Sequence, residues 1–317
     1  MIIKTRIEYF KEFLNYFWLR PENALMQTLR AEKLNKIYLK KFGKKNVKSM
    51  DNACGDGSFC FITFGGELNI SSDTFLSMDN SKRQSSKFDA YDYYDKKLKI
   101  KIKKKAIINF DTGTDWKKNL LRKSNQLDFF KQLVHHDNNK KMPFTDGEYD
   151  FTFTNSAYWV KNFATHINDL IRVTKPGKII VLEMKLRDEL VKYRAENFAN
   201  KIMGNTFSKV TDAGRWATWR GLPTRKQLMK IIKANQKCEI EDMQPIYGGM
   251  VAKLYDIGFR PLSKPLTIMA NSLTINHRKQ VKTEWCEIIM ELFSEFIEQY
   301  KVKDKEAMDY VVTLKKI

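Results

Sequence analysis

The chain has 317 residues, and 57 lysines and arginines against 37 acidic residues give it a formal net charge of +20. That length is enough to bury a substantial hydrophobic core. No stretch is apolar for the length of a membrane span, and the first 20 residues carry acids, unlike a secretory signal. The 4 cysteines include no C-x-x-C pair, and the 4 histidines show no metal-ligand spacing. We therefore expect a cytoplasmic protein with reduced thiols and no bound metal.

The positive charge has two interpretations. It could serve a nucleic acid or a peripheral contact with an anionic membrane surface, or it could reflect a genome that over-uses lysine codons. The lysines are scattered over many segments, which favours the second interpretation. The densest run, residues 96–105, alternates apolar residues with lysines. This alternation predicts a strand with one buried face and one basic face, which needs no partner.

The N-terminal segment predicts two helices. An apolar stripe at helical spacing runs along residues 7–18, and Arg20-Pro21 ends it. Pro21 suits the first turn of a second helix, which we expect to run towards Phe42. We interpret residues 1–42 as a helical cap in front of a larger unit, residues 43–317.

A glycine-rich segment at residues 51–57, Asp-Asn-Ala-Cys-Gly-Asp-Gly, follows a β-prone run at residues 46–50. A second β-prone run, residues 74–78, is followed by Asp79, 22 residues after Gly57. Many α/β proteins hold a nucleoside with a strand, the glycine-rich turn that follows it and a carboxylate about twenty residues later. We therefore expect the turn to approach the ligand and Asp79 to accept hydrogen bonds from the two ribose hydroxyls.

Acids in this turn indicate which nucleoside binds. Dinucleotide enzymes place a pyrophosphate at such a turn, and the carboxylates of Asp51 and Asp56 would repel it. They suit S-adenosylmethionine, whose sulfonium and α-ammonium groups are positive. With its D-x-A-C-G-D-G pattern the chain resembles the class I S-adenosylmethionine-dependent methyltransferases, whose first motif is typically D-x-G-x-G-x-G. Ala53 stands at the first glycine position, although alanine disfavours positive φ.

Later segments extend the resemblance in chain order. Residues 129–134, 151–154 and 178–183 read as strands, and a helix carrying Ile167 and Leu170 ends at a Thr-Lys-Pro-Gly break at residues 174–177. The resemblance covers residues 46–184 and points to the type 11, or UbiE-like, branch. It implies an α/β fold with a Rossmann-like seven-stranded sheet, helices on both faces and an antiparallel final strand near residues 310–314. It also implies a set of cofactor-binding residues, in which Asp137 and Asn138 face the adenine amino group: Asp51, Ala53, Gly55, Gly57, Asp79, Asp137, Asn138 and Asn155.

Two stretches look like insertions on that fold, at about residues 81–128 and 186–300. In the first we expect a turn at residues 111–113 and a helix over residues 116–127. In the second we expect helices over residues 186–203, from Thr224, and around residues 285–296, with a strand at residues 238–243.

The sequence says less about the residues that would bind the methyl acceptor. Trp216 and Trp219 alternate with arginines over residues 215–220, which suits stacking on a planar group or pairing with an anion, although a packed loop explains the pattern as well. We expect Tyr158 and Trp159 to line the approach to the methyl group, because they follow the fourth strand. Arg20 and the two tryptophans are expected to close over it.

The implied reaction is transfer of a methyl group by in-line displacement on the sulfonium. A hydroxyl acceptor usually needs a base, and Tyr158, His136 and His166 are candidates, although a buried structural histidine is an equal alternative. Residues 155–158, Asn-Ser-Ala-Tyr, lack the prolines of the N-P-P-Y motif, which argues against methylation of a flipped base. We expect a small-molecule, sugar-linked or lipid-linked acceptor. The alternatives are an RNA methyltransferase and a non-catalytic S-adenosylmethionine-binding module.

Overall fold

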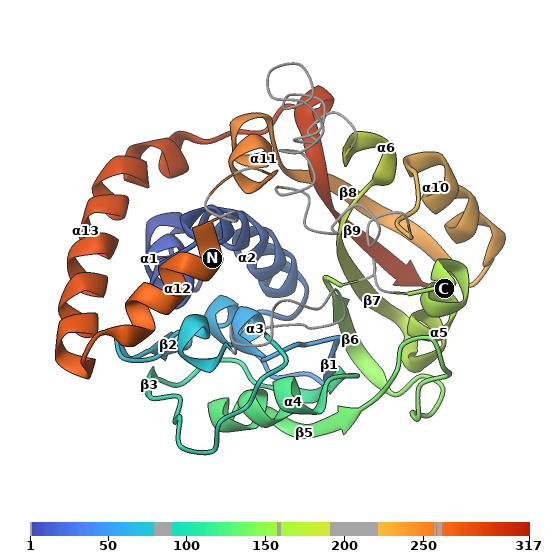
Figure 1. The fold of residues 1–317 in the computed structure, drawn as a ribbon. Coiled ribbons are helices and arrows are strands. Elements are labelled where there is room, and N and C mark those ends of the chain that lie inside the picture. Colours follow the sequence, from blue (N-terminus) through green and yellow to red (C-terminus); the bar gives the residue numbers. More distant parts are fainter. Residues whose placement is uncertain (1, 79–90, 157–159, 191–220, 257, 259–261) are drawn as a thin grey trace.

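The computed structural model describes residues 2–78, 91–156, 160–190, 221–256, 258 and 262–317. Its centre is a seven-stranded sheet with the order β5-β4-β1-β6-β7-β9-β8 (Figure 1). The strands are β1 Ser49–Asn52, β4 Phe110–Asp115, β5 Phe130–His135, β6 Tyr149–Thr154, β7 Thr174–Lys185, β8 Cys238–Gly248 and β9 Ala307–Lys316. Strand β9 runs antiparallel to both of its neighbours, whereas the pairs from β5 to β7 are parallel. The predicted Rossmann-like sheet with an antiparallel last strand is confirmed.

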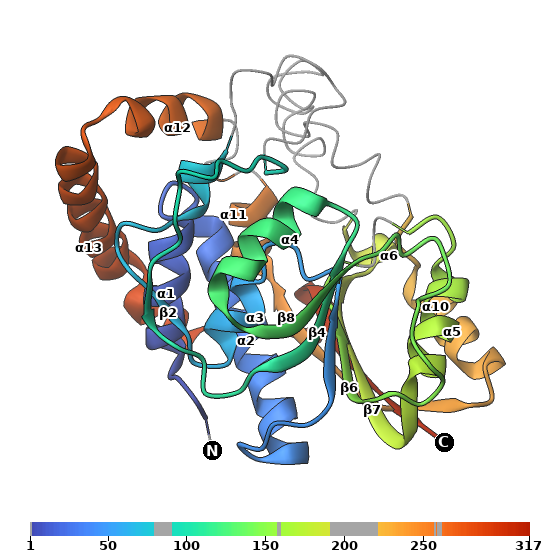
Figure 2. The same ribbon diagram turned by 90° about the horizontal axis from the view of Figure 1, so that it is seen from below.

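Helices cover both faces of this sheet, as Figure 2 shows. On one face lie α1 Arg6–Phe17, α2 Pro21–Phe42, α3 Ser58–Thr63 and α4 Lys118–Ser124, while α5 Phe163–Val173 and α10 Arg225–Ala234 lie on the other. Because helices bury both faces of the sheet, consecutive residues of a strand can all be apolar. Residues 179–182 of β7 form such a run.

The two N-terminal helices are confirmed, and their ends follow local rules. The side chain of Thr5 caps α1 in a reciprocal capping box with Glu8. Pro21 occupies the first turn of α2, as predicted, and Gly43 follows its last residue. Aromatic side chains of α1 and α2 enter the main core; for example, Tyr38 packs edge-on against Phe151 with ring centroids 5.0 Å apart.

Two predictions about residues 74–113 are wrong. Residues 74–77, expected in a strand, form a short 3₁₀ helix, because the Asp73 carboxylate caps the amides of Phe75 and Leu76. Residues 111–113, expected in a turn, lie inside β4 and pair with both β1 and β5. The second strand of the sheet is therefore β4, about 30 residues later than the sequence suggested.

The basic run at residues 96–105 forms less strand than predicted. Only Ile102–Lys104 is a strand, β3, and it pairs with β2, Glu67–Leu68, in a separate two-stranded sheet. Lys103 and Lys104 both form ion pairs with Glu67, at 3.0 and 3.7 Å. Part of the positive charge is thus neutralised within this small sheet.

The rest of the described chain is mainly helical. It contains α6 Arg187–Leu190, α11 Gly249–Asp256, α12 Ser263–Ser272 and α13 Ile275–Gln299, with 3₁₀ turns at Thr74–Ser77 (η1), Asn125–Leu127 (η2) and Asp304–Glu306 (η6). The helix predicted from Thr224 is confirmed as α10, which Thr224 caps, and the helix predicted around residues 285–296 is part of α13. None of the helices in the described ranges is both long and apolar enough to cross a bilayer. Helix α13 packs along the outside of α1, far from β5 (Figures 1 and 2).

Candidate functional site

In the glycine-rich turn between β1 and α3, every second residue has a positive φ angle. Ala53, Gly55 and Gly57 have φ values of 61°, 59° and 76°. A Cβ atom on Gly57 would lie 2.5 Å from Ser124 Oγ and 3.1 Å from Phe130. Gly57 is therefore needed for its backbone angle and for the close approach of α4 and β5. The predicted tight turn is present, and its alanine bears the strained φ that the sequence suggested.

Replacing Ala53 with glycine should relieve this strain. A side chain at positive φ costs about 1–2 kcal/mol, partly offset by the greater entropy of unfolded glycine. We expect Ala53→Gly to raise the free energy of unfolding by up to about 1 kcal/mol in denaturant titration. The matched control is Ala31→Gly inside α2, which should lower it by about 1 kcal/mol or more. Equal losses in the two variants would contradict the strain at Ala53.

Asp115, the last residue of β4, is the acid that lies beside the turn. Its Oδ2 atom accepts a hydrogen bond from the Gly55 amide at 3.0 Å, and its Oδ1 atom accepts one from the Lys117 amide at 2.8 Å. Burial raises the pKa of this carboxyl above its ordinary value, although the two amide hydrogen bonds act against that shift. Asp115 thus occupies the place, at the end of the strand next to β1, that the sequence interpretation gave to Asp79.

Polar residues after β5 complete this side of the site. Asn52 and Asn138 exchange two amide hydrogen bonds, of 2.9 and 3.0 Å, which hold the loop after β5 against the end of β1. Asp137 Oδ1 accepts the amide and the side chain of Asn139, and these bonds lower the pKa of Asp137. The turn, the end of β4 and this loop enclose a cavity of about 460 Å³. The following residues line it: Ala53, Gly55, Asp115, Trp116, Lys117, Leu120, Asp137, Asn138, Asn139, Ser156, Val160 and Lys161.

The two acids of the glycine-rich segment differ in their surroundings. Asp51 is 3% exposed, and its Oδ1 atom has no hydrogen-bond partner within the described ranges. Burial raises the pKa of Asp51 to about 7. Asp56 is instead engaged by the protein, because Tyr16 Oη donates to its Oδ2 atom at 2.6 Å and Ser58 donates to its Oδ1 atom. Only Asp51 keeps an unsatisfied carboxyl oxygen, and Tyr16 fastens the N-terminal cap to the turn.

The remaining predicted site residues are only partly described. Asp79, Tyr158, Trp159, Trp216 and Trp219 lie outside the described ranges. Asn155 follows β6 directly, and its Oδ1 atom accepts the Ser156 hydroxyl at 3.0 Å. Arg20 lies between α1 and α2, is buried, and forms an ion pair with Glu22 at 2.8 Å.

The two histidine candidates are separated, by distance or by the sheet itself, from the α2 face at the end of β6. His136 follows β5, which is three strands from β6 in the sheet, so about 14 Å separates the two strands. His166 lies on α5, which covers the opposite face of the sheet from α2. Both are buried, and burial lowers the pKa of His136 and lowers that of His166 to about 4. Both rings are therefore neutral near pH 7, as buried structural histidines are.

Asp115 and Trp116 are the site residues that sequence reasoning missed. The available signal was the stretch Phe-Asp-Thr-Gly-Thr-Asp-Trp at residues 110–116, in which β-prone threonines lead to an acid and an aromatic ring. The usual spacing of about twenty residues pointed instead to Asp79.

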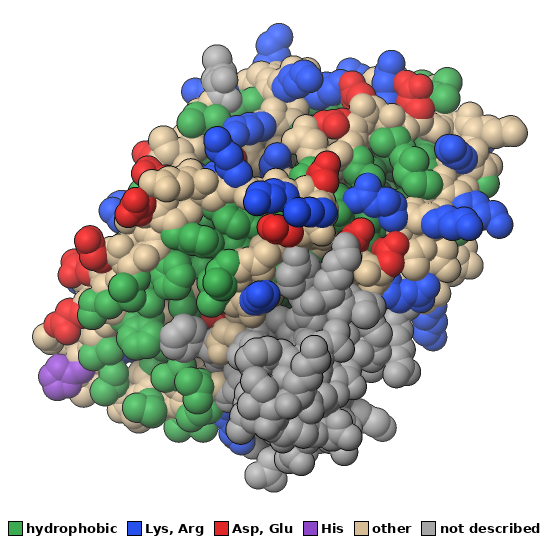
Figure 3. All heavy atoms as spheres, turned by 90° about the horizontal axis from the view of Figure 1, so that it is seen from above, with side chains coloured by type: hydrophobic (Ala, Val, Ile, Leu, Met, Phe, Trp, Pro, Cys, Tyr) green, Lys and Arg blue, Asp and Glu red, His purple; other side chains and the backbone are tan. Residues whose placement is uncertain are grey.

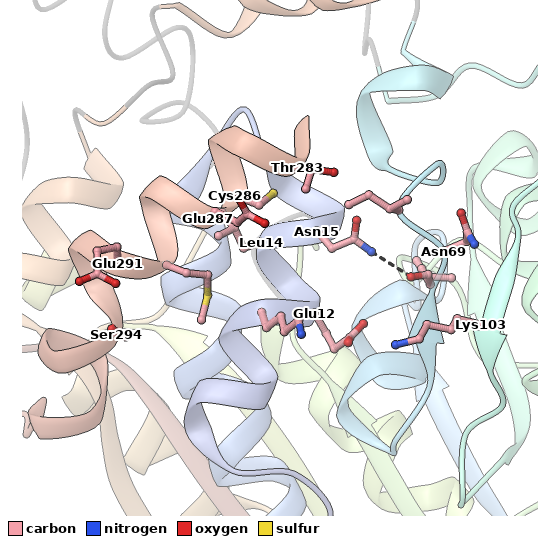
Figure 4. A pocket seen from close by; sticks show the side chains of 14 residues that line it. Glu12, Leu14, Asn15, Asn69, Lys103, Thr283, Cys286, Glu287, Glu291 and Ser294 are labelled. Carbon is pink, nitrogen blue, oxygen red and sulfur yellow. Dashed lines mark hydrogen bonds between the residues drawn. The ribbon is translucent and has the colours of Figure 1, made fainter. Parts of the chain in front are cut away.

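A larger cavity, of about 790 Å³, lies elsewhere, between α1 and α13. Figure 4 shows Glu12 and Asn15 of α1 pointing toward Lys103 and Asn69, while Cys286 and Glu287 line the groove from α13; Asn15 donates a 3.0 Å hydrogen bond to the Leu68 carbonyl. None of the turn residues lines this groove. Its size alone does not connect it with the site at the strand ends.

No family model matches the chain, and no curated protein matches it significantly. Among solved structures it is similar to the [4+2]-cyclase SpnF, with 14% identity over 90% of this chain and 80% of that one, and a TM-score of 0.44. It is similar to a Geobacter sulfurreducens S-adenosylmethionine-dependent methyltransferase bound to S-adenosylhomocysteine, with 13% identity over 90% and 91% of the two chains and a TM-score of 0.44. The plantazolicin methyltransferase BpumL, also bound to S-adenosylhomocysteine, has 13% identity over 92% and 84% of the chains and a TM-score of 0.44. At these values the function has to be argued from the site of this chain alone.

Proposed function

We propose that this protein binds S-adenosylmethionine in the cavity at the carboxyl ends of β1, β4 and β5 and transfers its methyl group to a small-molecule, sugar-linked or lipid-linked acceptor. The observation that carries the proposal is Asp115, a buried acid that contacts the glycine-rich turn and lines the same cavity as Asp137 and Asn138. Ligands of open α/β sheets bind at this edge of the sheet.

The residues of the cavity suit each part of the cofactor. The Asp115 carboxylate would accept the ribose hydroxyls, and Asp137 with Asn138 would meet the adenine amino group. Trp116, which is 57% exposed and lines the cavity, offers a flat surface for stacking on the adenine ring. Asp51 is not a lining residue but lies near the end of β1, just before the turn, and its unsatisfied Oδ1 atom would pair with the α-ammonium group, because a buried oxygen without a partner is otherwise unfavourable.

S-Adenosylmethionine, when bound, supplies an electrophilic methyl group. The protein then has to align the acceptor with that methyl and exclude water. Arg20, Tyr158, Trp159, Trp216 and Trp219 remain our proposed acceptor-side residues. The acceptor can be sought by screening hydroxyl, amine and lipid-linked compounds for release of S-adenosylhomocysteine.

Two alternatives are less favoured. On the face in Figure 3, basic side chains are interspersed with acidic and apolar ones, which does not suggest a continuous track for an RNA backbone. A non-catalytic module would bind S-adenosylmethionine without releasing S-adenosylhomocysteine, so measured turnover would exclude it.

A variant at Asp115 tests the cofactor proposal. Asp115→Asn keeps an oxygen for the Gly55 amide, replaces the oxygen that accepts the Lys117 amide, and removes the charge that would strengthen bonds from the ribose hydroxyls. Charge-assisted hydrogen bonds contribute about 1.5–3 kcal/mol, so we expect the dissociation constant for S-adenosylhomocysteine to rise at least about tenfold in calorimetry.

The matched control is Asp111→Asn on the same strand. Asp111 accepts the Ser49 amide and pairs with Lys131 at the opposite end of β4 from the cavity, so this variant should bind S-adenosylhomocysteine like the parent. Binding of NAD by the parent protein without binding of S-adenosylhomocysteine would overturn the proposal.

A further inference from the structure

One buried carboxyl near the carboxyl ends of β6 and β7 has no hydrogen-bond partner in the described part of the chain. Glu183 lies on β7, one residue beyond the point where Thr154, the end of β6, pairs with Leu182. It is therefore level with Asn155, at the carboxyl edge of the sheet. Asp51 pairs with Phe153, and Phe153 pairs with Val181. Since residues two apart on a strand share a face, Glu183 and Asp51 lie on the same side of the sheet, the side that α2 covers.

The surroundings of Glu183 leave its carboxyl unsatisfied. The side chain is fully buried, and neither Oε1 nor Oε2 has a hydrogen-bond partner in the described part of the chain. The two nearby cationic side chains, Arg30 and Lys185, bind the carboxylate of Asp309 instead. Arg30 of α2 donates twice to Asp309 of β9, at 2.9 and 2.5 Å, and Lys185 lies 3.5 Å from the same carboxylate. A buried carboxyl without partners is rare in folded proteins and calls for an explanation.

Charged and titratable groups face Glu183 from each element around it. They are Arg30 on α2, Lys185 on β7, Asp309 on β9, Asp51 on β1 and Cys60 on α3. Burial raises the pKa of Glu183 to about 8; the two acids act in the same direction, and Arg30 and Lys185 act against them. Near pH 7 the carboxyl is thus mostly protonated, and an added positive charge nearby would ionise it.

We propose that Glu183 is the proton acceptor of the reaction, and that it loses its own proton when a sulfonium donor binds beside it. This inference rests on the proposed function and adds the catalytic base to it. It follows from the position of Glu183 next to the end of β6, on the face shared with Asp51, and from its unsatisfied carboxyl oxygens. The histidines considered from the sequence lie three strands away or on the opposite face.

The proton balance of the step is simple. Donor binding sends the Glu183 proton to solvent and leaves a carboxylate. During transfer, the bond between sulfur and methyl breaks, its electron pair stays on sulfur, and the methyl bonds to the acceptor oxygen or nitrogen. The proton of that atom moves to Glu183. The acceptor is therefore a hydroxyl compound or an amine that carries a proton, and with neutral sulfur the carboxyl returns to its protonated form.

Calorimetry can test this without a known acceptor. S-Adenosylmethionine and S-adenosylhomocysteine share the α-ammonium group and differ in the methyl group and the charge on sulfur. Titrating each at pH 7 in two buffers of different ionisation enthalpy counts the protons released. A charge within about 7 Å at an effective dielectric near 20 lowers a carboxyl pKa by between about one and two. Since the pKa then falls from about 8 to between about 6 and 7, we expect S-adenosylmethionine to release between about 0.4 and 0.8 of a proton more than S-adenosylhomocysteine at pH 7.

The Glu183→Gln variant should bind S-adenosylhomocysteine like the parent, and it should release equal numbers of protons with the two ligands. The His166→Gln variant should keep the parent's difference in proton release. If the Gln variant did not fold, infrared spectra of the parent would give the same readout: a protonated-carboxyl band should disappear with S-adenosylmethionine and persist with S-adenosylhomocysteine. Equal proton release for the two ligands, or a difference that survives in Glu183→Gln, would overturn the role of Glu183 alone. A parent protein that does not bind S-adenosylhomocysteine would instead overturn the proposed function.

Discussion

Glu183→Gln is expected to change how the stability of the protein depends on pH. The pKa of Glu183 is about 8 in the folded protein against an ordinary value of 4.5. Between these values the folded state binds a proton that the unfolded state has lost, so the free energy of unfolding falls as pH rises, by about 1.4 kcal/mol per pH unit. The full loss is reached above the folded pKa and is about 5 kcal/mol. A neutral glutamine of the same shape removes this contribution.

The measurement is the free energy of unfolding of parent and variant, from urea titrations at pH 5 and pH 9. We expect the two proteins to be similar near pH 5 and the Gln variant to be more stable by several kcal/mol at pH 9. Asp51 also has a raised pKa and is present in both proteins, so it enters the difference only through its coupling with Glu183. A constant difference between the two curves would mean that Glu183 is ionised in the fold throughout this range.

Much of the fold could be predicted because strong local signals agree with the tertiary structure. Pro21 at the start of α2 and Thr224 at the cap of α10 are short-range rules that the packing does not override. The apolar run of β7 and the stripe of α5 also match their burial. The glycine-rich turn was recognisable because its backbone angles need small residues.

Strand β4 was missed because its local composition conflicts with its place in the sheet. Asp-Thr-Gly at residues 111–113 is typical of a turn, yet Gly113 is needed in the strand for packing. A Cβ atom there would lie 2.9 Å from Leu133 and 3.1 Å from Cys54 Sγ. Because Asp115 follows this strand, the same conflict concealed the acid that lies against the turn. The isolation of Glu183 was also beyond sequence reasoning, since it depends on Arg30 and Lys185 both facing the distant Asp309.

Asp73→Ala is expected to be one of the most destabilising single substitutions in the described chain. The carboxylate of Asp73 joins the segment before η1 to α13, because Arg278 donates to both of its oxygens at 2.8 and 3.0 Å and Lys282 lies 3.3 Å away. All three side chains are buried, with at most 8% of their surface exposed. Removing the acid leaves two cations in a region of low dielectric and also removes the cap of η1.

Breaking a buried ion pair by removing one partner costs about 3–5 kcal/mol. We expect Asp73→Ala to lower the free energy of unfolding by about this amount in urea titration. Hydrogen exchange should quicken first in α12 and α13, because Arg278 also packs over Trp18, 5.3 Å from its ring centroid, and Trp285 donates to the Trp18 carbonyl at 2.7 Å. These contacts tie α13 to the end of α1, and the ion cluster holds them in place.

The matched control is Asp128→Asn, which removes the charge of an acid in an exposed pair and keeps a residue that tolerates the left-handed backbone at this position. Asp128 and Lys105 are each 74% exposed, and solvent-exposed ion pairs contribute little to stability, so the control should unfold almost like the parent. The difference between the two variants measures burial rather than charge, because each substitution removes one carboxylate. If Asp73→Ala unfolded like Asp128→Asn, then Lys282 would be satisfied by the Ile70 and Ser72 carbonyls, which it also contacts at 2.8 and 3.3 Å, and water would have to reach Arg278. In that case α13 would be held to α1 by its apolar contacts alone.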